Sequence, residues 1–380
     1  MTDCSDKMVN LPLFHRVPLE QVQAVLPLLR RQRVPAGKRL WSVGDVGNRL
    51  GILLSGSLRA RVQGQPIGII RRGGVFGEVG GFFSEGRRTA DLVSDEDCRV
   101  ALFYRSDLEQ MRADHPLVYD AILRECVYAL AERVGATTLA LAKLAPGGVH
   151  RPVRQERAGL SRLWRAMVPG GPSSPCPPLL PLLRNQPTML EVAESVLLQI
   201  AEQFKKRSVE QGEVLCLEGD PVNGAWLLAH GGVDIVRNVG VARGEFLASI
   251  KVGNFFGQNG LQRPNATRSA SCVASEAGWL YQIDLAASRT LKGEAWRVWN
   301  ETLLHSFFEQ IRNSNEALGS LVLSERNSGQ PTAVTSEDED LASIMGSDGV
   351  LVGEGLEDEL EQMDFVVDDA ARREAFGPKR

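Results

Sequence analysis

Residues 76–92 read FGEVGGFFSEGRRTADL, and this stretch is the most informative part of the sequence for fold and function. A glycine at position 77 lets a strand ending at Phe76 turn sharply into a short helical segment that begins at Glu78. Free backbone N–H groups at the start of such a segment form a site for an anion. Arg88 follows Glu78 by ten residues and can return a planar guanidinium group, which suits a phosphate, to the same place. The stretch therefore predicts a pocket for a phosphate-bearing ligand whose hydroxyl groups can donate to the Glu78 carboxylate.

Short apolar or alternating runs separated by glycine turns surround this stretch. From Gln32 onward these runs are RLW, LGILL, SLRARV, IGII, TADLV and CRVALFY. Many short strands at close spacing are typical of an antiparallel roll or sandwich. Apolar residues at helical spacing precede the runs, from Leu11 to Leu29, and follow them in SDLEQMRADHP and LVYDAILRECVYALAERVGATTLALAKL. We therefore expect a β-roll flanked by helices.

The same order of segments returns about 180 residues later, so the chain contains an internal repeat. AGKRLWSVGD at 36–45 parallels QGEVLCLEGD at 211–220, and residues 73–93 parallel 253–273. The second copy has about five additional residues in a predicted hairpin near 238–243. A chain of 380 residues is also long for a single hydrophobic core. The predicted fold class is mainly β with α, as two tandem jelly-roll-like β-rolls, each flanked by helices.

Composition divides the chain into four predicted parts. They are the first roll at 9–143, a Pro- and Gly-rich linker at 144–184, the second roll at 185–325 and an acidic, disordered tail at 326–380. In the linker, SRLWRAMV is a candidate for a short basic helical contact. From Ser336 to Ala370 the tail has thirteen acidic residues and no basic ones. We expect it to be solvated; the alternative is that ELEQMDFVV docks as a short helix on a basic surface.

Bulk properties narrow the class of protein. The formal net charge of −4 argues weakly against a dedicated nucleic-acid binder. The first ten residues lack an apolar signal core, and there is no apolar run of 18 residues, so we expect a cytoplasmic protein without a membrane partner. The cysteines form no C-x-x-C pair and have no histidine at zinc spacing, so we expect reduced, mostly buried thiols and no metal site. They are Cys4, Cys98, Cys126, Cys176, Cys216 and Cys272.

The decisive stretch resembles the phosphate-binding cassette of the cyclic-nucleotide-binding domain family. This family includes catabolite activator protein, the regulatory subunits of cAMP-dependent protein kinase and the cyclic-nucleotide-gated channels. Its pattern F-G-E-[LIV]-[AG], followed by R-[STA]-A, is matched by residues 76–80 and 88–90 with the spacing of the bacterial activators. The resemblance covers residues 9–143 and includes the turns at 44–45 and 55–57. It implies a ligand-binding roll, and the repeat implies two of them in tandem.

The resemblance also implies roles for individual residues. Glu78 would hold the ribose 2′-hydroxyl and Arg88 the cyclic phosphate, while Thr89 and the amides of residues 77–79 would hold the remaining phosphate oxygens. The long helix after the roll closes over the base in this family, and counting forward places Arg133 there; the alternative is a solvated helix residue. In another alternative, Glu78 and Arg88 form an internal ion pair in an unliganded roll. The predicted site comprises Gly77, Glu78, Val79, Arg88, Thr89, Ala90 and Arg133.

The ligand implied by the resemblance is cAMP or cGMP, with no metal. Thr89 does not decide between the two nucleotides, because cGMP-binding relatives use a threonine here and bacterial cAMP binders carry serine or threonine too. We favour cAMP slightly over cGMP.

The second copy has a compromised cassette. Its possible site comprises Gly257, Gln258, Arg268, Ser269 and Ala270, with a glutamine where the pattern has glutamate. The amide removes the charge that would orient Arg268 and adds a donor that needs a partner. Loss of one charge-assisted hydrogen bond costs about 1.5–3 kcal/mol, or roughly tenfold to a hundredfold in affinity. We expect the second roll to bind weakly or to serve as a structural and dimerising partner.

Three functional classes compete: receptor, transcription regulator and enzyme. No P-loop or kinase motif occurs, and the five histidines stand in unrelated segments, so we expect no enzyme. Neither roll is followed by a recognition helix, which makes a transcription regulator the weaker interpretation. We expect a cyclic nucleotide receptor that relays binding to an unidentified protein effector by conformational change, with a homodimer as a candidate assembly.

Two further alternatives remain for the output of such a receptor. Tandem rolls resemble the regulatory subunits that inhibit a protein kinase. The inhibitory R-R-x-[AS] segment of that family, however, has no counterpart among the roughly ten residues that precede the first roll. A ligand-free scaffold or dimerisation protein is the other alternative.

Overall fold

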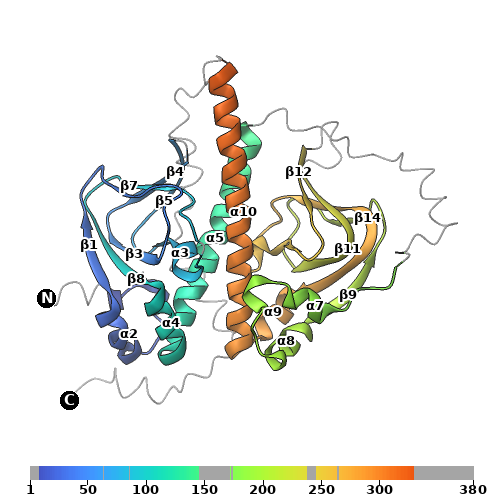
Figure 1. Cartoon of the computed structure of the whole chain (residues 1–380), viewed down its shortest axis with the longest axis horizontal. Coiled ribbons are helices and arrows are strands. Elements are labelled where there is room, and N and C mark those ends of the chain that lie inside the picture. The colour runs from blue at the N-terminus through green and yellow to red at the C-terminus, as the bar shows by residue number, and fades with distance from the viewer. Residues whose placement is uncertain are drawn as a thin grey trace.

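The computed structural model describes residues 8–62, 64–84, 86–144, 172, 174–237, 245–262 and 265–328. Two β-rolls stand on either side of a pair of long helices, α5 (Pro116–Leu144) and α10 (Gly293–Ser328) (Figure 1). The predictions for the acidic tail, for SRLWRAMV and for the hairpin near 238–243 lie outside the described residues.

Two four-stranded antiparallel sheets form the first roll, in the strand orders β1-β8-β3-β6 and β2-β7-β4-β5. The strands are β1 (Arg30–Val34), β2 (Arg39–Trp41), β3 (Arg49–Ser55), β4 (Leu58–Val62), β5 (Gln65–Ile70), β6 (Val75–Phe76), β7 (Asp91–Ser94) and β8 (Cys98–Tyr104). The helices are α2 (Leu19–Val25), α3 (Glu78–Phe82), α4 (Arg105–Asp114) and α5, with 3-10 turns η1 (Pro12–Phe14) and η2 (Leu26–Leu28). This arrangement confirms the predicted roll flanked by helices.

One strand of the first roll escaped the sequence pattern. In β1 only Val34 is buried, and the four residues from Arg30 to Arg33 are exposed. Because β1 lies at the edge of its sheet and pairs only with β8, its sequence RRQRV lacks the apolar alternation of a half-buried strand.

The second roll repeats the first with longer strands. The strands are β9 (Phe204–Val209), β10 (Val214–Cys216), β11 (Gly224–Arg237), β12 (Glu245–Ile250), β13 (Phe255–Phe256) and β14 (Ser271–Asp284). β11 and β14 each have 14 residues and extend through both layers of the roll. The six strands therefore form one continuous antiparallel sheet. The other elements are α7 (Leu179–Arg184), η3 (Pro187–Met189), α8 (Glu194–Ala201), η4 (Gln258–Gly260), α9 (Leu285–Thr290) and α10.

The C-terminal part of the predicted linker has regular structure. Residues 179–184 form α7, and Leu183 is fully buried against the second roll. The apolar run LLPLL therefore packs as part of the second domain rather than connecting the two.

The two rolls share one hydrophobic core. A single cluster of buried residues joins Phe14 and Ile122 of the first half to Trp299 and Phe307 of the second. Smaller clusters lie inside each roll, around Phe76 in the first and around residue 256 in the second. Because most of the shared cluster lies on α5, α10 and the elements packed on them, these helices tie the two rolls together.

Charged side chains fix the contact between the first roll and α10. The carboxylate of Asp120 accepts from Arg297 at 2.6 Å, and Glu301 accepts from Arg112 at 3.0 Å and from the Tyr119 hydroxyl at 2.6 Å. Burial and the neighbouring Glu301 raise the pKa of Tyr119 well above its ordinary value, so it stays a neutral donor. These contacts set how α5 and α10 lie against each other.

Candidate functional site

The first cassette begins where β6 ends. Gly77 follows Phe76 with φ 74°, in the left-handed region, and α3 starts at the next residue. A Cβ at position 77 would lie 2.3 Å from a guanidinium nitrogen of Arg88, so only glycine fits here. Glu78 is 2% exposed and Val79 is also buried. The turn thus places a carboxylate, the start of a short helix and an arginine around one point.

A cage of carbonyls and one aromatic ring holds Arg88. Its Nη1 donates to the carbonyl of Gly77 at 3.2 Å and its Nη2 to that of Arg49 at 3.0 Å. The guanidinium carbon lies 3.4 Å from the ring centroid of Trp41. Burial lowers the pKa of Arg88 to about 10, although the Glu78 carboxylate acts in the opposite direction. Arg88 Nε is buried without a hydrogen-bond partner among the described residues, so the side chain has spare donor capacity for an anion.

Glu78 forms its ion pair with Arg133 of α5. The two side chains meet at 2.7 Å, and Arg133 also donates to the carbonyl of Val75 at 2.8 Å. Arg133 thus lies beside the cassette, and its predicted contact with a base stays a prediction. The partner of Glu78 is thus the long helix and not the cassette arginine, which replaces the internal Glu78–Arg88 pair that the sequence allowed.

The helix of the second domain also reaches the first cassette. Asn315 of α10 donates from Nδ2 to the carbonyl of Thr89 at 2.9 Å. The ring of His305 packs edge-on against Phe83, with 5.2 Å between centroids. Thr89 and Ala90 are half-buried beside this contact. Residues from both halves of the chain therefore surround the first candidate pocket.

The turn before the cassette is built alike in both rolls. In each, a glycine N–H donates to the carbonyl of the cassette arginine, at 2.8 and 2.9 Å, and the arginine N–H donates to an aspartate carbonyl at 2.8 Å. The residues are Gly44, Asp45 and Arg88 in the first roll and Gly219, Asp220 and Arg268 in the second. The G-D turn noted in the sequence thus positions the cassette arginine.

The second cassette keeps the backbone of the first. Gly257 has φ 73°, and a 3-10 turn starts at Gln258. Gln258 is 0% exposed, its Nε2 donates to Ser306 of α10 at 2.7 Å, and its Oε1 is buried without a partner among the described residues. Ser269 is exposed and Ala270 is buried. Gln258 therefore forms a neutral hydrogen bond to a helix, where Glu78 of the first cassette forms an ion pair.

Arg268 sits in a cage similar to that of Arg88. It donates to the carbonyls of Gly257 at 2.5 Å and Gly224 at 2.9 Å, and to Oδ1 of Asn223 at 2.9 Å. Its guanidinium carbon lies 4.6 Å from the ring centroid of Trp226. Burial lowers the pKa of this arginine too.

The tryptophan beside each cassette arginine comes from a different strand. In the first roll it is Trp41 of β2, and Gly51 of β3 leaves room for the ring of residue 76. In the second roll Trp226 of β11 occupies the position equivalent to Gly51, because each pairs with the strand just before its cassette. Cys216 then stands where the aligned repeat has Trp41.

The sequence pattern missed several side chains of the two cassettes. Trp41 and Asn223 line the arginine cages, and Asn315 reaches across from the other half. In the alignment of the two copies Trp41 corresponds to Cys216, and this difference could have identified Trp41 as part of the first cage. The contact of Asn315 depends on how α10 packs on the first roll, and no local pattern reports that.

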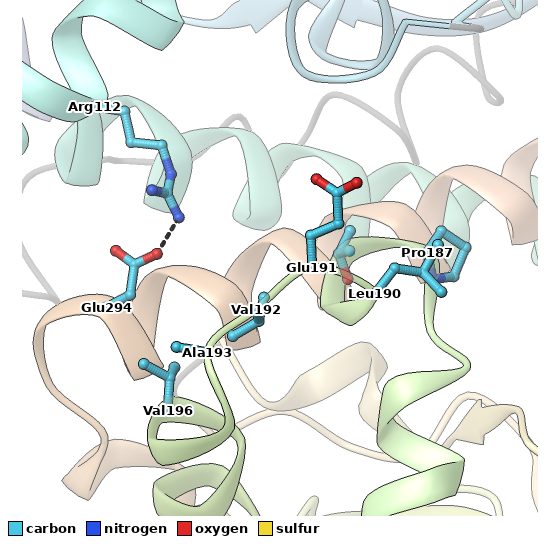
Figure 2. A pocket seen from close by; sticks show the side chains of 9 residues that line it. Arg112, Pro187, Leu190, Glu191, Val192, Ala193, Val196 and Glu294 are labelled. Carbon is cyan, nitrogen blue, oxygen red and sulfur yellow. Dashed lines mark hydrogen bonds and ion pairs between the residues drawn. The ribbon is translucent and has the colours of Figure 1, made fainter.

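A separate hollow of about 640 Å³ lies between α4, α10 and residues 187–196. Figure 2 shows Arg112 reaching across it to Glu294, an ion pair of 2.5 Å. The hollow is lined by Arg112, Pro187, Thr188, Leu190, Glu191, Val192, Ala193, Val196 and Glu294, none of which belongs to a cassette.

Two kinds of feature are absent from the described residues. No group of three or more histidine, cysteine, aspartate or glutamate side chains among them is placed to hold a metal ion. No helix in the described part of the chain is long and apolar enough to cross a membrane.

Comparison with known proteins gives one family and several relatives. The family model for the cyclic nucleotide-binding domain matches residues 31–115 and 206–292. A curated relative, the cyclic AMP receptor protein of Thermus thermophilus, is 32% identical over 116 residues, which are 29% of this chain and 53% of the relative. The chain thus spans about half the length of that curated relative.

Solved structures are similar to one or both halves. The catabolite activator protein of Thermus thermophilus is 29% identical and covers 36% of this chain and 72% of its own, with a TM-score of 0.27. The regulatory domain of Toxoplasma gondii PKA with cAMP is 15% identical and covers 77% of this chain and 92% of its own, with a TM-score of 0.28. Because the family model matches each roll separately, this chain carries two cyclic nucleotide-binding domains in tandem.

Proposed function

We propose that this chain is a non-enzymatic receptor whose first domain binds a cyclic nucleotide and relays the binding to a protein partner. The observation that carries the proposal is the convergence of Glu78, Arg88 and the start of α3 in one buried place. A carboxylate for a ribose hydroxyl and a guanidinium for a cyclic phosphate are the two groups that such a ligand needs.

A bound phosphate would take over donors that Arg88 now shares with carbonyls. The guanidinium contacts the carbonyls of Gly77 and Arg49, which are neutral acceptors. An anionic acceptor forms stronger hydrogen bonds than a neutral one, so the exchange favours the ligand. The buried Nε of Arg88, which has no hydrogen-bond partner within the described part of the chain, supports the same conclusion.

The relay would run through Arg133. This residue links α5 to the cassette through its ion pair with Glu78. A ribose hydroxyl at Glu78 competes for the same carboxylate and changes the hold of the cassette on α5. Because α5 packs along α10, a shift of α5 changes a surface to which both halves contribute. A partner protein that recognises this surface would sense the ligand.

We propose cAMP ahead of cGMP as the nucleotide. The curated relative that matches part of the chain is named a cyclic AMP receptor protein, which supports this order. The cytoplasmic location and the homodimer expected from the sequence stay predictions.

The second domain would bind a nucleotide weakly. Gln258 supplies no charge, and its amide is already engaged with Ser306. The domain retains a caged arginine, so its fold does not depend on the missing carboxylate.

Calorimetric titration with cAMP and with cGMP tests the proposal. Wild-type protein should release or absorb heat with at least one nucleotide, Arg88→Ala should abolish the tight phase, and Arg268→Ala, as the matched control, should preserve it. Loss of the heat in Arg268→Ala alone would assign the ligand to the second domain. The absence of heat with either nucleotide would contradict the receptor proposal and favour a ligand-free scaffold.

A further inference from the structure

Two cysteines face each other across adjacent strands of the second domain. Cys216 of β10 and Cys272 of β14 are paired across the antiparallel strands, next to an irregularity in the register between Val214 and Cys216. Directly opposed residues of antiparallel strands have their side chains on the same face and their Cα atoms about 4.5–5.5 Å apart. This separation lies within the range that a disulfide can bridge, roughly 4.4–6.8 Å.

The pair is buried close to a sheet edge. Cys216 is 8% exposed and Cys272 is 4% exposed, and both belong to the core cluster of the second roll. β10 lies at the edge of its sheet, and two residues near Cys216, Val214 within the strand and Leu217 just after it, are 44% and 45% exposed.

The surroundings favour one thiolate in the pair. A hydrogen bond from the Cys272 thiol, together with the charge of Arg268, lowers the pKa of Cys216 to about 7, against the effect of burial. The same hydrogen bond and burial raise the pKa of Cys272. Arg268 thus lies where it stabilises a thiolate at Cys216. The first domain has no cysteine at the equivalent position, which is Trp41.

We propose that Cys216 and Cys272 are a reversible oxidation site whose oxidant is a peroxide. The Cys216 thiolate attacks hydrogen peroxide, forms an S–O bond and releases hydroxide, which takes up a proton to become water. The Cys272 sulfur then attacks the sulfenic acid sulfur, forms the S–S bond and releases a second water. Two thiols and one peroxide give one disulfide and two waters, so the two electrons lost by sulfur reduce the peroxide.

The site belongs to the second domain alone. The aligned positions of the first domain are Trp41 and Leu92, which also face each other across β2 and β7. The first domain therefore fills this place with a ring over its arginine, whereas the second fills it with a thiol pair. The proposal does not depend on nucleotide binding at either cassette.

Peptide mapping of the full chain after peroxide treatment tests the site. The protein is unfolded in the presence of a thiol-blocking reagent and digested, and the peptides are weighed with and without dithiothreitol. We expect the peptides that contain Cys216 and Cys272 to be linked, with the link lost on reduction. Cys98 and Cys126, buried in the first domain, are the internal controls and should remain blockable thiols after unfolding.

Variants assign the order of events. In Cys272→Ser, Cys216 should be trapped as a sulfenic acid by dimedone, with no disulfide; in Cys216→Ser, Cys272 should react far more slowly. Free thiols at both positions after treatment, or over-oxidation of Cys216 without a link, would overturn the proposal. The wild-type map decides the matter even if a variant fails to fold.

Discussion

Both domains hold their cassette arginine in a similar cage, but they link the cassette to a helix through different contacts. In the first, Glu78 forms an ion pair with Arg133, so the cassette and the long helix are joined by charge. In the second, Gln258 donates a neutral hydrogen bond to Ser306.

This difference separates the parts of the cassette that belong to the fold from the parts that we propose hold a ligand. The glycine turn, the arginine cage and a tryptophan occur in both domains, and only the carboxylate and its arginine partner are confined to the first. A domain can therefore keep its architecture after it loses the charged groups that we assign to ligand binding.

Aromatic rings pack together in the second domain, and removing the central ring should have the largest effect on stability. Trp299 is buried between Phe204 and Phe255, with ring centroids at 5.8 and 5.4 Å. Trp299→Ala should destabilise the protein by about 3–5 kcal/mol, because a large cavity is left. Thermal unfolding measures the loss, and Trp299→Phe, which keeps an aromatic ring, should be much milder. Equal effects of both variants would show that this packing does not hold the domain together.

Replacing the carboxylate makes the first cassette more like the second. Glu78→Gln removes the charge that pairs with Arg133 and should weaken nucleotide binding roughly tenfold to a hundredfold, or about 1.5–3 kcal/mol. Calorimetric titration gives the affinity, and Gln258→Ala in the second domain is the control that should leave it unchanged. An unaltered affinity in Glu78→Gln would remove the basis for contrasting the two cassettes.

Breaking the contact between the halves should have an intermediate effect. Arg297→Ala leaves the Asp120 carboxylate without its partner at a partly buried place, where the two side chains are 17% and 18% exposed. We expect a loss of stability of about 1–2 kcal/mol, below the value for fully buried pairs because solvent screens this one. Arg312→Ala, which breaks a more exposed pair with Glu309 on the same helix, should cost less than about 0.5 kcal/mol. A loss no greater than this control would mean that the pair does not join the domains.

The smallest expected effect is on the response to pH. Burial lowers the pKa of His305 below its ordinary value of 6.5, although Glu309 acts in the opposite direction. The unfolded chain therefore binds this proton more readily than the folded protein, so the contribution to stability is intact above about pH 6.5 and is lost as the pH falls below it.

The test is to compare thermal unfolding of wild type and His305→Phe at about pH 7.5 and pH 5.5. The variant should lose less stability on acidification. Glu125, whose pKa is raised by burial, contributes with the opposite sign in both proteins, so the difference between them isolates His305. The same response to pH in both proteins would show that His305 does not titrate in this range.

The sequence predicted the local parts of this fold well, because strands with alternating apolar residues and glycine turns carry their own signals. It missed β1, whose residues from Arg30 to Arg33 are exposed, and the helical part of the linker, where LLPLL was taken as a connection. In the cassettes it identified the turn glycines and both arginines. It did not identify Asn315 or the shared core, since these depend on the packing of α10 between the rolls.

We propose that one complete and one incomplete nucleotide site stand on the same framework. Equilibrium dialysis of the full chain against labelled cAMP, in the low micromolar range, counts the sites directly. We expect one tightly bound nucleotide per chain and none in Arg88→Ala. Two sites of equal affinity, with one left after Arg88→Ala, would contradict it.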